Sequence, residues 1–224
     1  MVWSPELAYA VGLIASDGCL SSDGRHLFFV SKDSEQIENF KKCLGLEVKT
    51  GIHRAGARMK NRTYHRVQWG DVVLYAFLLD IGLMPNKSKI LGALAVPDEY
   101  FFDFLRGSFD GDGSFYSYFD PRWKSSFMYY LNFTSASPIH IDWLRETLHR
   151  LLGVRGHISK MGGPNASRSL IANLRYAKQE SLVVMNAMYS TPCSIHLSRK
   201  RLKIEAALRI VGESLAGTTK NLTK

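Results

Sequence analysis

The sequence predicts an α+β fold built from two pseudo-symmetric halves that meet at a two-helix interface. The first observation is a repeated order of elements, in which each half reads as helix, two strands, helix, two strands, helix. The second is that each half opens with an apolar helix ending in Asp-Gly, at Asp17 and at Asp112. The third is composition: 224 residues, 46% apolar and 22% charged, suit a folded chain with room for two domains of about 100 residues.

The first half is predicted to span residues 1–95. Ser4 is placed to cap a helix that starts at Pro5, and Gly18 is placed to end it. The remaining elements follow from β-propensity and from the spacing of apolar residues: strands over residues 27–30, 48–53 and 64–69, and helices over residues 32–44 and 72–79.

The second half, residues 96–213, repeats this order with a longer loop over residues 118–126. Its first helix is predicted over residues 100–109 and runs into Asp-Gly-Asp-Gly. The other elements are strands over 115–119, 127–133, 154–160 and 169–176, and helices over 139–152, 179–189 and 199–211. Residues 214–224 are expected to form a frayed tail.

Charge and cysteine content narrow the function classes. Lys and Arg number 29 and Asp and Glu 20, giving a net charge of +9, which favours an anionic partner, nucleic acid first and an acidic membrane surface second. No apolar run approaches the roughly 18 residues of a membrane span, and residues 7–15 make a poor signal peptide because Glu6 precedes them. Cys19, Cys43 and Cys193 lack metal-site spacing and suggest single thiols in a reducing compartment.

Small residues recur four apart in both Asp-Gly helices, at Gly12 and Ser16 and at Gly107 and Gly111. This spacing lets two helix backbones approach closely, so both helices would end at one level near a pseudo-two-fold axis. Asp17 and Asp112 would then lie close together at the negative ends of two helix dipoles.

Two such carboxylates need a cation, and Mg²⁺ suits oxygen ligands. The carbonyls of Ser16 and Gly111 could add ligands. Two symmetric acid–metal sites suit attack of water on two phosphodiesters, one per strand. A single Asp-Gly is more often a turn or a helix stop. A calcium loop beginning at Asp110 is excluded, since its sixth position is Phe115 and its twelfth is Pro121.

The two segments, residues 10–18 and 105–113, resemble the paired motifs of LAGLIDADG homing endonucleases in their single-chain form. The second segment matches well, whereas the first has Ala15-Ser16 where an acidic-then-small pair is common. The resemblance implies two αββαββα halves whose curved antiparallel sheets form a saddle over DNA. It also implies that Asp17 and Asp112 are catalytic metal ligands and that Asp110 serves structure.

The same resemblance implies a basic residue from each repeat near the scissile phosphate. Lys87 and Lys200 match best, and Lys89 is an alternative to Lys87. Such a cation could stabilise the phosphorane or lower the pKa of the attacking water. A solvated basic helix start, or phosphate contacts away from the chemistry, is the competing interpretation. Lys32 and Ser135 resemble the polar residues that order the water network.

DNA reading requires polar and basic side chains on one face of a strand pair. In residues 64–69, Tyr64, Arg66 and Gln68 share one face, and the other face looks core-like. Four tyrosines at 116, 118, 129 and 130 suggest base stacking, but core packing explains most of them more simply. The other candidate DNA contacts are Arg25, His53, Arg54, Arg58, Lys60 and Arg62 in the first half and Arg122, Lys124, Lys160, Arg168, Asn173 and Arg175 in the second.

The resemblance and the charge together predict a monomeric, site-specific double-strand DNA endonuclease. We expect it to use Mg²⁺, with Mn²⁺ substituting and Ca²⁺ supporting binding without cleavage. It would hydrolyse one phosphodiester per strand across the minor groove and leave short 3′ overhangs. The alternatives are an intron maturase that binds RNA and a DNA-binding regulator. An intracellular, DNA-associated location is expected, in a prokaryotic cytoplasm or an organelle matrix.

Overall fold

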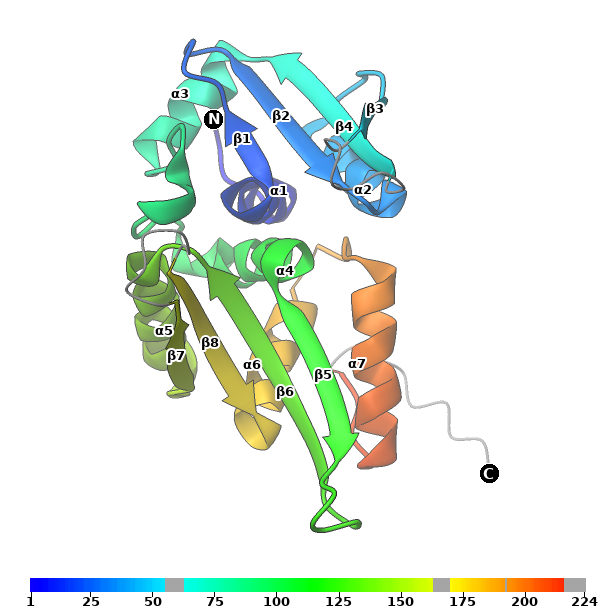
Figure 1. The fold of residues 1–224 in the computed structure, drawn as a ribbon. Helices are drawn as coiled ribbons and strands as arrows, with labels where there is room; N and C mark the ends of the chain where they lie inside the picture. Colours follow the sequence, from blue (N-terminus) through cyan, green and yellow to red (C-terminus); the bar gives the residue numbers. More distant parts are fainter. Residues whose placement is uncertain (55–62, 163–169, 192, 216–224) are drawn as a thin grey trace.

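The computed structural model describes residues 1–54, 63–162, 170–191 and 193–215, and its first half confirms the predicted order of elements (Figure 1). The second strand, β2, and the helix after it, α2, agree with the prediction to within two residues at each end. The first half consists of α1 (Pro5–Ser16), β1 (Gly18–Leu20), β2 (His26–Ser31), α2 (Ser34–Leu44), β3 (Gly51–Arg54), β4 (Thr63–Gly70), α3 (Val72–Asp80) and the 3₁₀ turn η2 (Lys87–Lys89).

The second half repeats the order of elements found in the first half and ends in an additional helix, α7. Its four strands have the order β5-β6-β8-β7, and those of the first half have the equivalent order β1-β2-β4-β3, with every neighbouring pair antiparallel. This agreement confirms the duplicated α+β fold. The elements are η3 (Asp98–Tyr100), α4 (Phe101–Asp112), β5 (Ser114–Phe119), β6 (Phe127–Ser135), α5 (Pro138–Leu152), β7 (His157–Met161), β8 (Ile171–Ala177), α6 (Lys178–Tyr189) and α7 (Ser198–Ile210).

Two strands begin three residues later than predicted, at Gly51 and at His157. Before β7 the chain passes through Gly153 and Gly156, whose φ angles of 72° and 59° hold a turn rather than extended backbone. Before β3, Gly45 ends α2 in the left-handed conformation, with φ 61°, and residues 46–50 connect it to the strand. Of the tail expected to be frayed, residues 216–224 lie outside the described residues, and Leu215 is buried.

Helices α1 and α4 pack side by side between the two sheets (Figure 1). A Cβ atom on Gly12 would stand 2.1 Å from the Phe104 carbonyl oxygen, and one on Gly107 would stand 2.1 Å from that of Tyr9. Both distances are far below van der Waals contact, so only glycine permits this packing. The close approach predicted from the small-residue spacing is confirmed.

Alternation along the strands gives each sheet a buried face and an outer face. In β4, Val67 and Trp69 are buried, while Gln68 is exposed. In β8, Ala172, Leu174 and Tyr176 are buried, which leaves the alternate residues on the outer face. The outer faces of both sheets therefore carry polar and basic side chains, as predicted.

No helix in the described part of the chain is both long enough and apolar enough to cross a membrane. The three cysteines are free thiols, as expected from their spacing.

Candidate active site

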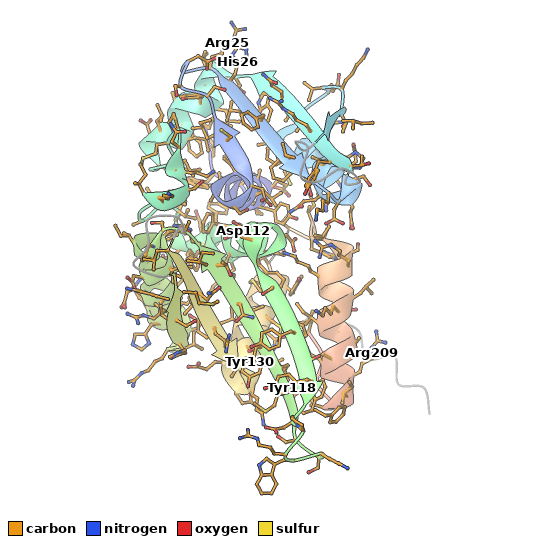
Figure 2. All side chains as sticks on the ribbon, viewed as in Figure 1. Arg25, His26, Asp112, Tyr118, Tyr130 and Arg209 are labelled. Atoms are coloured by element: carbon orange, nitrogen blue, oxygen red, sulfur yellow. The ribbon has the colours of Figure 1, made fainter. Side chains whose placement is uncertain are left out.

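Asp17 and Asp112 lie at the ends of the paired helices. Asp17 caps the C-terminus of α1, and its backbone N–H donates to the Leu13 carbonyl at 2.9 Å. Asp112 is the last residue of α4, and Figure 2 places it between the two sheets. Asp17 Oδ2 stands 3.2 Å from where a Cβ on Gly111 would be, so the Asp17 carboxylate lies against the last turn of α4. The structure thus brings the two helix-end carboxylates together.

Both carboxylates are accessible to solvent, yet each is set among protein atoms that weaken its hydration. Burial, followed by repulsion from Asp112, raises the pKa of Asp17 from 3.8 to about 6. Burial also raises the pKa of Asp112, and the charges of Lys200 and Lys87 oppose the increase. Raised pKa values at two exposed, adjacent carboxylates indicate a site that would be stabilised by a bound cation.

Lys200 is 9% exposed and its ammonium group closes the end of α4. Its Nζ donates to the carbonyl oxygens of Phe109, Gly111 and Gly113 at 2.5, 3.0 and 2.7 Å. These bonds use all three N–H donors of the ammonium group. Burial lowers the pKa of Lys200 to about 8. Lys200 therefore fixes the backbone around Asp112 and supplies positive charge beside it.

Lys87 occupies the equivalent place in the first half. It is 5% exposed, and its Nζ donates to the carbonyl oxygen of Gly18, the residue after Asp17. Gly18 corresponds to Gly113, a Lys200 acceptor, so the two lysines are related by the pseudo-symmetry. Lys89 is exposed instead. Of the two candidates in this segment, the geometry favours Lys87.

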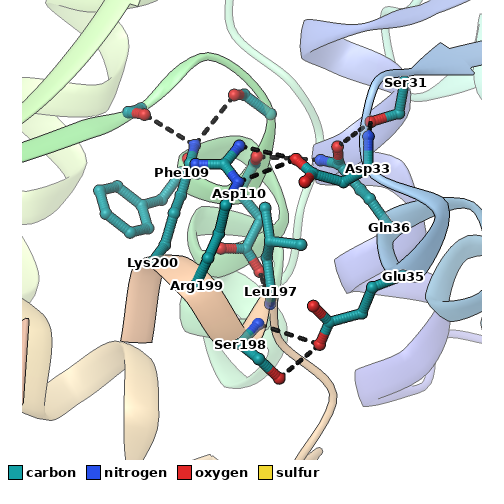
Figure 3. A network of polar contacts seen from close by, with 12 residues as sticks. Ser31, Asp33, Glu35, Gln36, Phe109, Asp110, Leu197, Ser198, Arg199 and Lys200 are labelled. Atoms are coloured by element: carbon teal, nitrogen blue, oxygen red, sulfur yellow. Dashed lines mark hydrogen bonds and ion pairs between the residues drawn. The ribbon is translucent and has the colours of Figure 1, made fainter. Parts of the chain in front are cut away.

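Asp110 is 1% exposed and joins the two halves. Its Oδ2 accepts hydrogen bonds from the Tyr9 hydroxyl and from the Leu197 N–H, both at 2.8 Å. Its backbone carbonyl accepts from Gln36 Nε2 at 2.9 Å (Figure 3). This burial and these partners suit the structural role that the resemblance implied.

The donor set at the helix ends fits a hard divalent cation. Within the four described ranges, His, Cys, Asp and Glu side chains form no group of three or more that could hold a metal. A metal there would depend on the two carboxylates, on backbone carbonyls and on oxygens from water or a substrate. Mg²⁺ tolerates such a set, because it usually keeps several waters and takes one or two carboxylates. The Gly111 carbonyl already accepts from Lys200, so one of its two lone pairs remains.

The outer face of the first sheet presents the residues predicted from the alternation in 64–69. The Arg66 guanidinium lies 4.7 Å from the centre of the Phe28 ring and its Nη2 donates to Gln68 Oε1 at 2.7 Å. Lys32 is exposed just after β2, with its Nζ 5.6 Å from the centre of the Tyr64 ring. Arg25 is exposed in the turn before β2.

The outer face of the second sheet carries an aromatic stack. The Tyr116 and Tyr130 rings are 4.9 Å apart at 21°, and Tyr118 is stacked on both at 6.4 and 6.1 Å. The Arg175 guanidinium lies 5.8 and 5.6 Å from the Tyr116 and Tyr130 rings, and its Nε donates to Asn132 Oδ1 at 3.1 Å. Core packing was therefore the wrong explanation for three of the four tyrosines, and only Tyr129 is buried, at 4% exposure.

Two of the predicted DNA contacts, Lys160 and Ser135, do not lie on the outer face of the second sheet. Lys160 pairs with the buried Ala172, and so falls on the opposite face of the sheet from Asn173 and Arg175. The Ser135 hydroxyl accepts from the Ser137 N–H at 3.1 Å, at the entry to α5. Arg122 and Lys124 are exposed in the β5–β6 turn, where Arg122 is paired with Asp120 at 3.0 Å. Arg58, Lys60, Arg62 and Arg168 lie outside the described residues, and for His53 and Arg54 only their place in β3 is described.

Some residues around the site had not been predicted from the sequence. Arg106 is 1% exposed and forms an ion pair with Asp103 at 2.7 Å, and its Nε donates to the Ile195 carbonyl at 2.8 Å. An arginine between the apolar residues Phe104, Leu105 and Phe109 of α4 was the available signal for it. Glu35 and Ser137 gave no comparable signal, because each forms its hydrogen bonds with a segment distant in sequence.

Comparison with protein-family models and with curated proteins finds no match. Solved structures do match. Full-length DUF199/WhiA from Thermatoga maritima matches at TM-score 0.58 and 16% identity, over 95% of this chain and 62% of that one. I-AabMI, a LAGLIDADG meganuclease bound to uncleaved DNA, matches at TM-score 0.60 and 12% identity, over 94% and 92% of the two chains. I-SmaMI, bound to an uncleaved DNA target with calcium ions, matches at 0.57 and 14%, over 94% and 92%.

At these identities the comparison concerns the fold. The chain spans 62% of the length of the WhiA structure and more than nine-tenths of the two DNA-bound structures. The element order, the sheet order and the two paired helices agree with the fold implied by the Asp-Gly segments. The chain therefore has the two-domain LAGLIDADG fold of the single-chain homing endonucleases.

Proposed function

We propose that this protein is a site-specific double-strand DNA endonuclease dependent on a divalent metal. The observation that carries the proposal is the pair of helix-end carboxylates, Asp17 and Asp112, with raised pKa values and a buried lysine beside each. Two related acidic sites suit hydrolysis of one phosphodiester in each strand. The structural relatives include proteins bound to uncleaved DNA, which supports duplex DNA as the partner.

The proposed metal ligands are Asp17 and Asp112, with the carbonyls of Ser16 and Gly111 as further oxygens. Mg²⁺ held there would neutralise the carboxylates and polarise the scissile phosphates. The accessibility of Asp17 and Asp112 leaves them open to a substrate that lies along the outer faces of the sheets. Mn²⁺ is expected to substitute, and Ca²⁺ to support binding without cleavage.

The two lysines have different proposed parts. Lys200 has all three donors engaged, so it acts through its charge and by holding the end of α4 in place. Lys87 donates to Gly18 alone among the hydrogen bonds found in the described residues, which leaves N–H donors for a phosphate oxygen.

The DNA would lie across both outer faces, with Arg66 and Gln68 reading one half-site and Asn173 and Arg175 the other. The division into residues 1–95 and 96–213 is proposed because each sheet and its helices fall within one of these ranges. One chain holds both acidic sites, so a monomer is proposed as the active form, and short 3′ overhangs as the product.

The test is Mg²⁺-dependent cleavage of a randomised plasmid library, with the cut ends sequenced. We expect staggered breaks at one long motif. Asp17→Asn and Asp112→Asn should each lower cleavage by about 10³-fold or more while Ca²⁺-supported binding persists. Asp80→Asn is the matched control, because Asp80 is an exposed carboxylate at the end of α3 and belongs to neither of the two helices whose ends form the site. Full activity in either site variant would overturn the assignment.

The second candidate is a binding protein that does not cut. It is favoured by the match to DUF199/WhiA, since the same fold is found there outside the homing endonucleases. Intact plasmid together with tight, specific duplex binding would support a regulator. Preference for intron RNA over every duplex would support a maturase.

A further inference from the structure

The segment that carries Lys200 is held by the opposite half of the molecule (Figure 3). Glu35 Oε1, in the first turn of α2, accepts hydrogen bonds from both the backbone N–H, at 3.0 Å, and the hydroxyl of Ser198. Asp33 Oδ2 accepts from Nε and Nη2 of Arg199 at 2.9 and 2.8 Å. These two acceptors therefore fix the first turn of α7 directly before Lys200.

The segment that carries Lys87 is also held by the opposite half, but here the opposite half donates the hydrogen bonds and the lysine segment accepts them. The Ser137 hydroxyl donates to the Leu91 carbonyl at 2.6 Å, and His140 Nδ1 lies 2.9 Å from the Gly92 carbonyl oxygen. A carbonyl only accepts, so the Nδ1–H of His140 is the donor. Both partners come from the start of α5 in the second half, and both acceptors lie within five residues of Lys87.

These contacts obey the pseudo-symmetry of the fold. Helix α2 follows the central strand β2 in one sheet, and α5 follows the equivalent strand β6 in the other. Each helix begins at the boundary between the halves and binds the lysine segment of the other half. A single contact of this kind would be unremarkable on a protein surface, but two related contacts at equivalent places indicate a shared role.

We propose that the first turns of α2 and α5 are cross-half positioning elements, in which Asp33 and Glu35 place Lys200, and Ser137 and His140 place Lys87. The proposal rests on the endonuclease function proposed above. A lysine that must act on one phosphate has to be held to within about 1 Å, and a rigid anchor near it in sequence serves that end. Each lysine is then in place only when the two halves are docked.

Breaking one anchor should disturb one lysine and leave the other in place. Glu35→Ala removes both acceptor contacts to Ser198, whereas Glu35→Gln keeps a side-chain oxygen able to accept them. Ser137→Ala removes the contact to Leu91. Glu38→Ala is the matched control, because Glu38 lies one turn further along α2 and pairs with Lys41 in its own helix.

Hydrogen exchange on the free protein tests the anchoring without requiring cleavage. With Glu35→Ala, the amides of residues 197–202 should exchange at least about fivefold faster, while those of residues 87–92 keep their rate. Ser137→Ala should produce the reverse pattern, and Glu38→Ala neither. Unchanged exchange at both segments would overturn the proposal, even if the protein proves not to cut DNA.

Strand-resolved cleavage of the site found in the library tests the consequence. Glu35→Ala should slow cleavage of one strand by about tenfold relative to the other, so that nicked plasmid accumulates. Ser137→Ala should slow the opposite strand, and Glu35→Gln should restore most of the lost rate. If Glu35→Ala slowed cleavage of both strands equally, Glu35 would only stabilise the fold, and the proposal would be overturned. Failure of the wild type to cut would instead remove the endonuclease assignment, with hydrogen exchange still deciding the anchoring.

Discussion

The two halves share their sheet order and their helix-end carboxylates, but their buried lysines come from different elements and bind different numbers of carbonyls. Lys200 comes from the 13-residue helix α7 and donates to three carbonyls of α4 and the residue after it. Lys87 comes from a three-residue 3₁₀ turn and donates to Gly18. The halves are therefore alike at the pseudo-two-fold axis, where the carboxylates lie and the chemistry would occur. They differ in the elements that carry the lysines.

A buried arginine and a buried aspartate account for much of this divergence. Arg106 binds the Met188 and Ile195 carbonyls, and so ties the approach to α7 onto α4. Asp110 accepts from the Leu197 N–H at the start of α7. The equivalent positions in α1, 95 residues earlier, are Val11 and Ala15, both apolar and buried. The first half lacks these anchors and also lacks a counterpart of α7 among its described elements.

The largest effect that would sharpen this comparison is on stability. Lys200→Met removes three hydrogen bonds to carbonyls and should lower the free energy of unfolding by about 2–3 kcal/mol, part of the loss being offset because a charge is no longer buried. Lys87→Met removes a single hydrogen bond to Gly18 and should cost about 1 kcal/mol. Urea unfolding at pH 7 measures both. Equal losses would show that the extra bonds of Lys200 contribute nothing.

The outer faces of the sheets allow a second comparison, through DNA affinity. Arg175 lies on the outer face of the second sheet beside two tyrosine rings, whereas Lys160 lies on the opposite face. Arg175→Ala should weaken binding of the target by about tenfold in Ca²⁺, and Arg66→Ala should do the same from the first half. Lys160→Ala should change the affinity by less than about twofold. Titration at several salt concentrations measures these values, and a larger effect at Lys160 would contradict the assignment of the DNA face.

The features set by local spacing could be predicted from the sequence. Glycine and serine four apart located the close helix pair, and with it the meeting of Asp17 and Asp112. Alternation within 64–69 assigned the residues to the correct faces of the sheet. The assignment was possible because Val67 and Trp69 are large apolar residues that identify the buried face. The faces on which Lys160 and Tyr130 lie were not predicted correctly. Each is defined by the residue paired with it on the neighbouring strand, Ala172 for Lys160 and Ala177 for Tyr130, and the sequence does not identify these pairs.

The contacts between the halves were beyond sequence-based reasoning for a different reason. Glu35 and Ser198 are 163 residues apart, and no spacing rule connects them. A serine at a helix start or an acidic residue in a first turn is ordinary in either half taken alone. Only the docking of the two domains turns these residues into a pair, so the anchoring of the lysines could not be predicted from either half.

The smallest expected effect concerns the charge at the axis. The pKa of Asp17 is about 6 in the folded protein, against a usual 3.8, so the fold favours the protonated carboxyl. This preference stabilises the folded protein fully below about pH 4, and the stabilisation is lost as the pH rises through 6. Asp17→Asn should therefore raise the melting temperature at pH 8, by about 2–4 °C since screening limits an exposed carboxylate, and the gain should vanish near pH 4. Mg²⁺ should raise the melting temperature of the wild type at pH 8 more than that of the variant. If the increase in melting temperature persisted at pH 4, the asparagine would be acting through packing. Repulsion between Asp17 and Asp112 would then not destabilise the contact between the two halves.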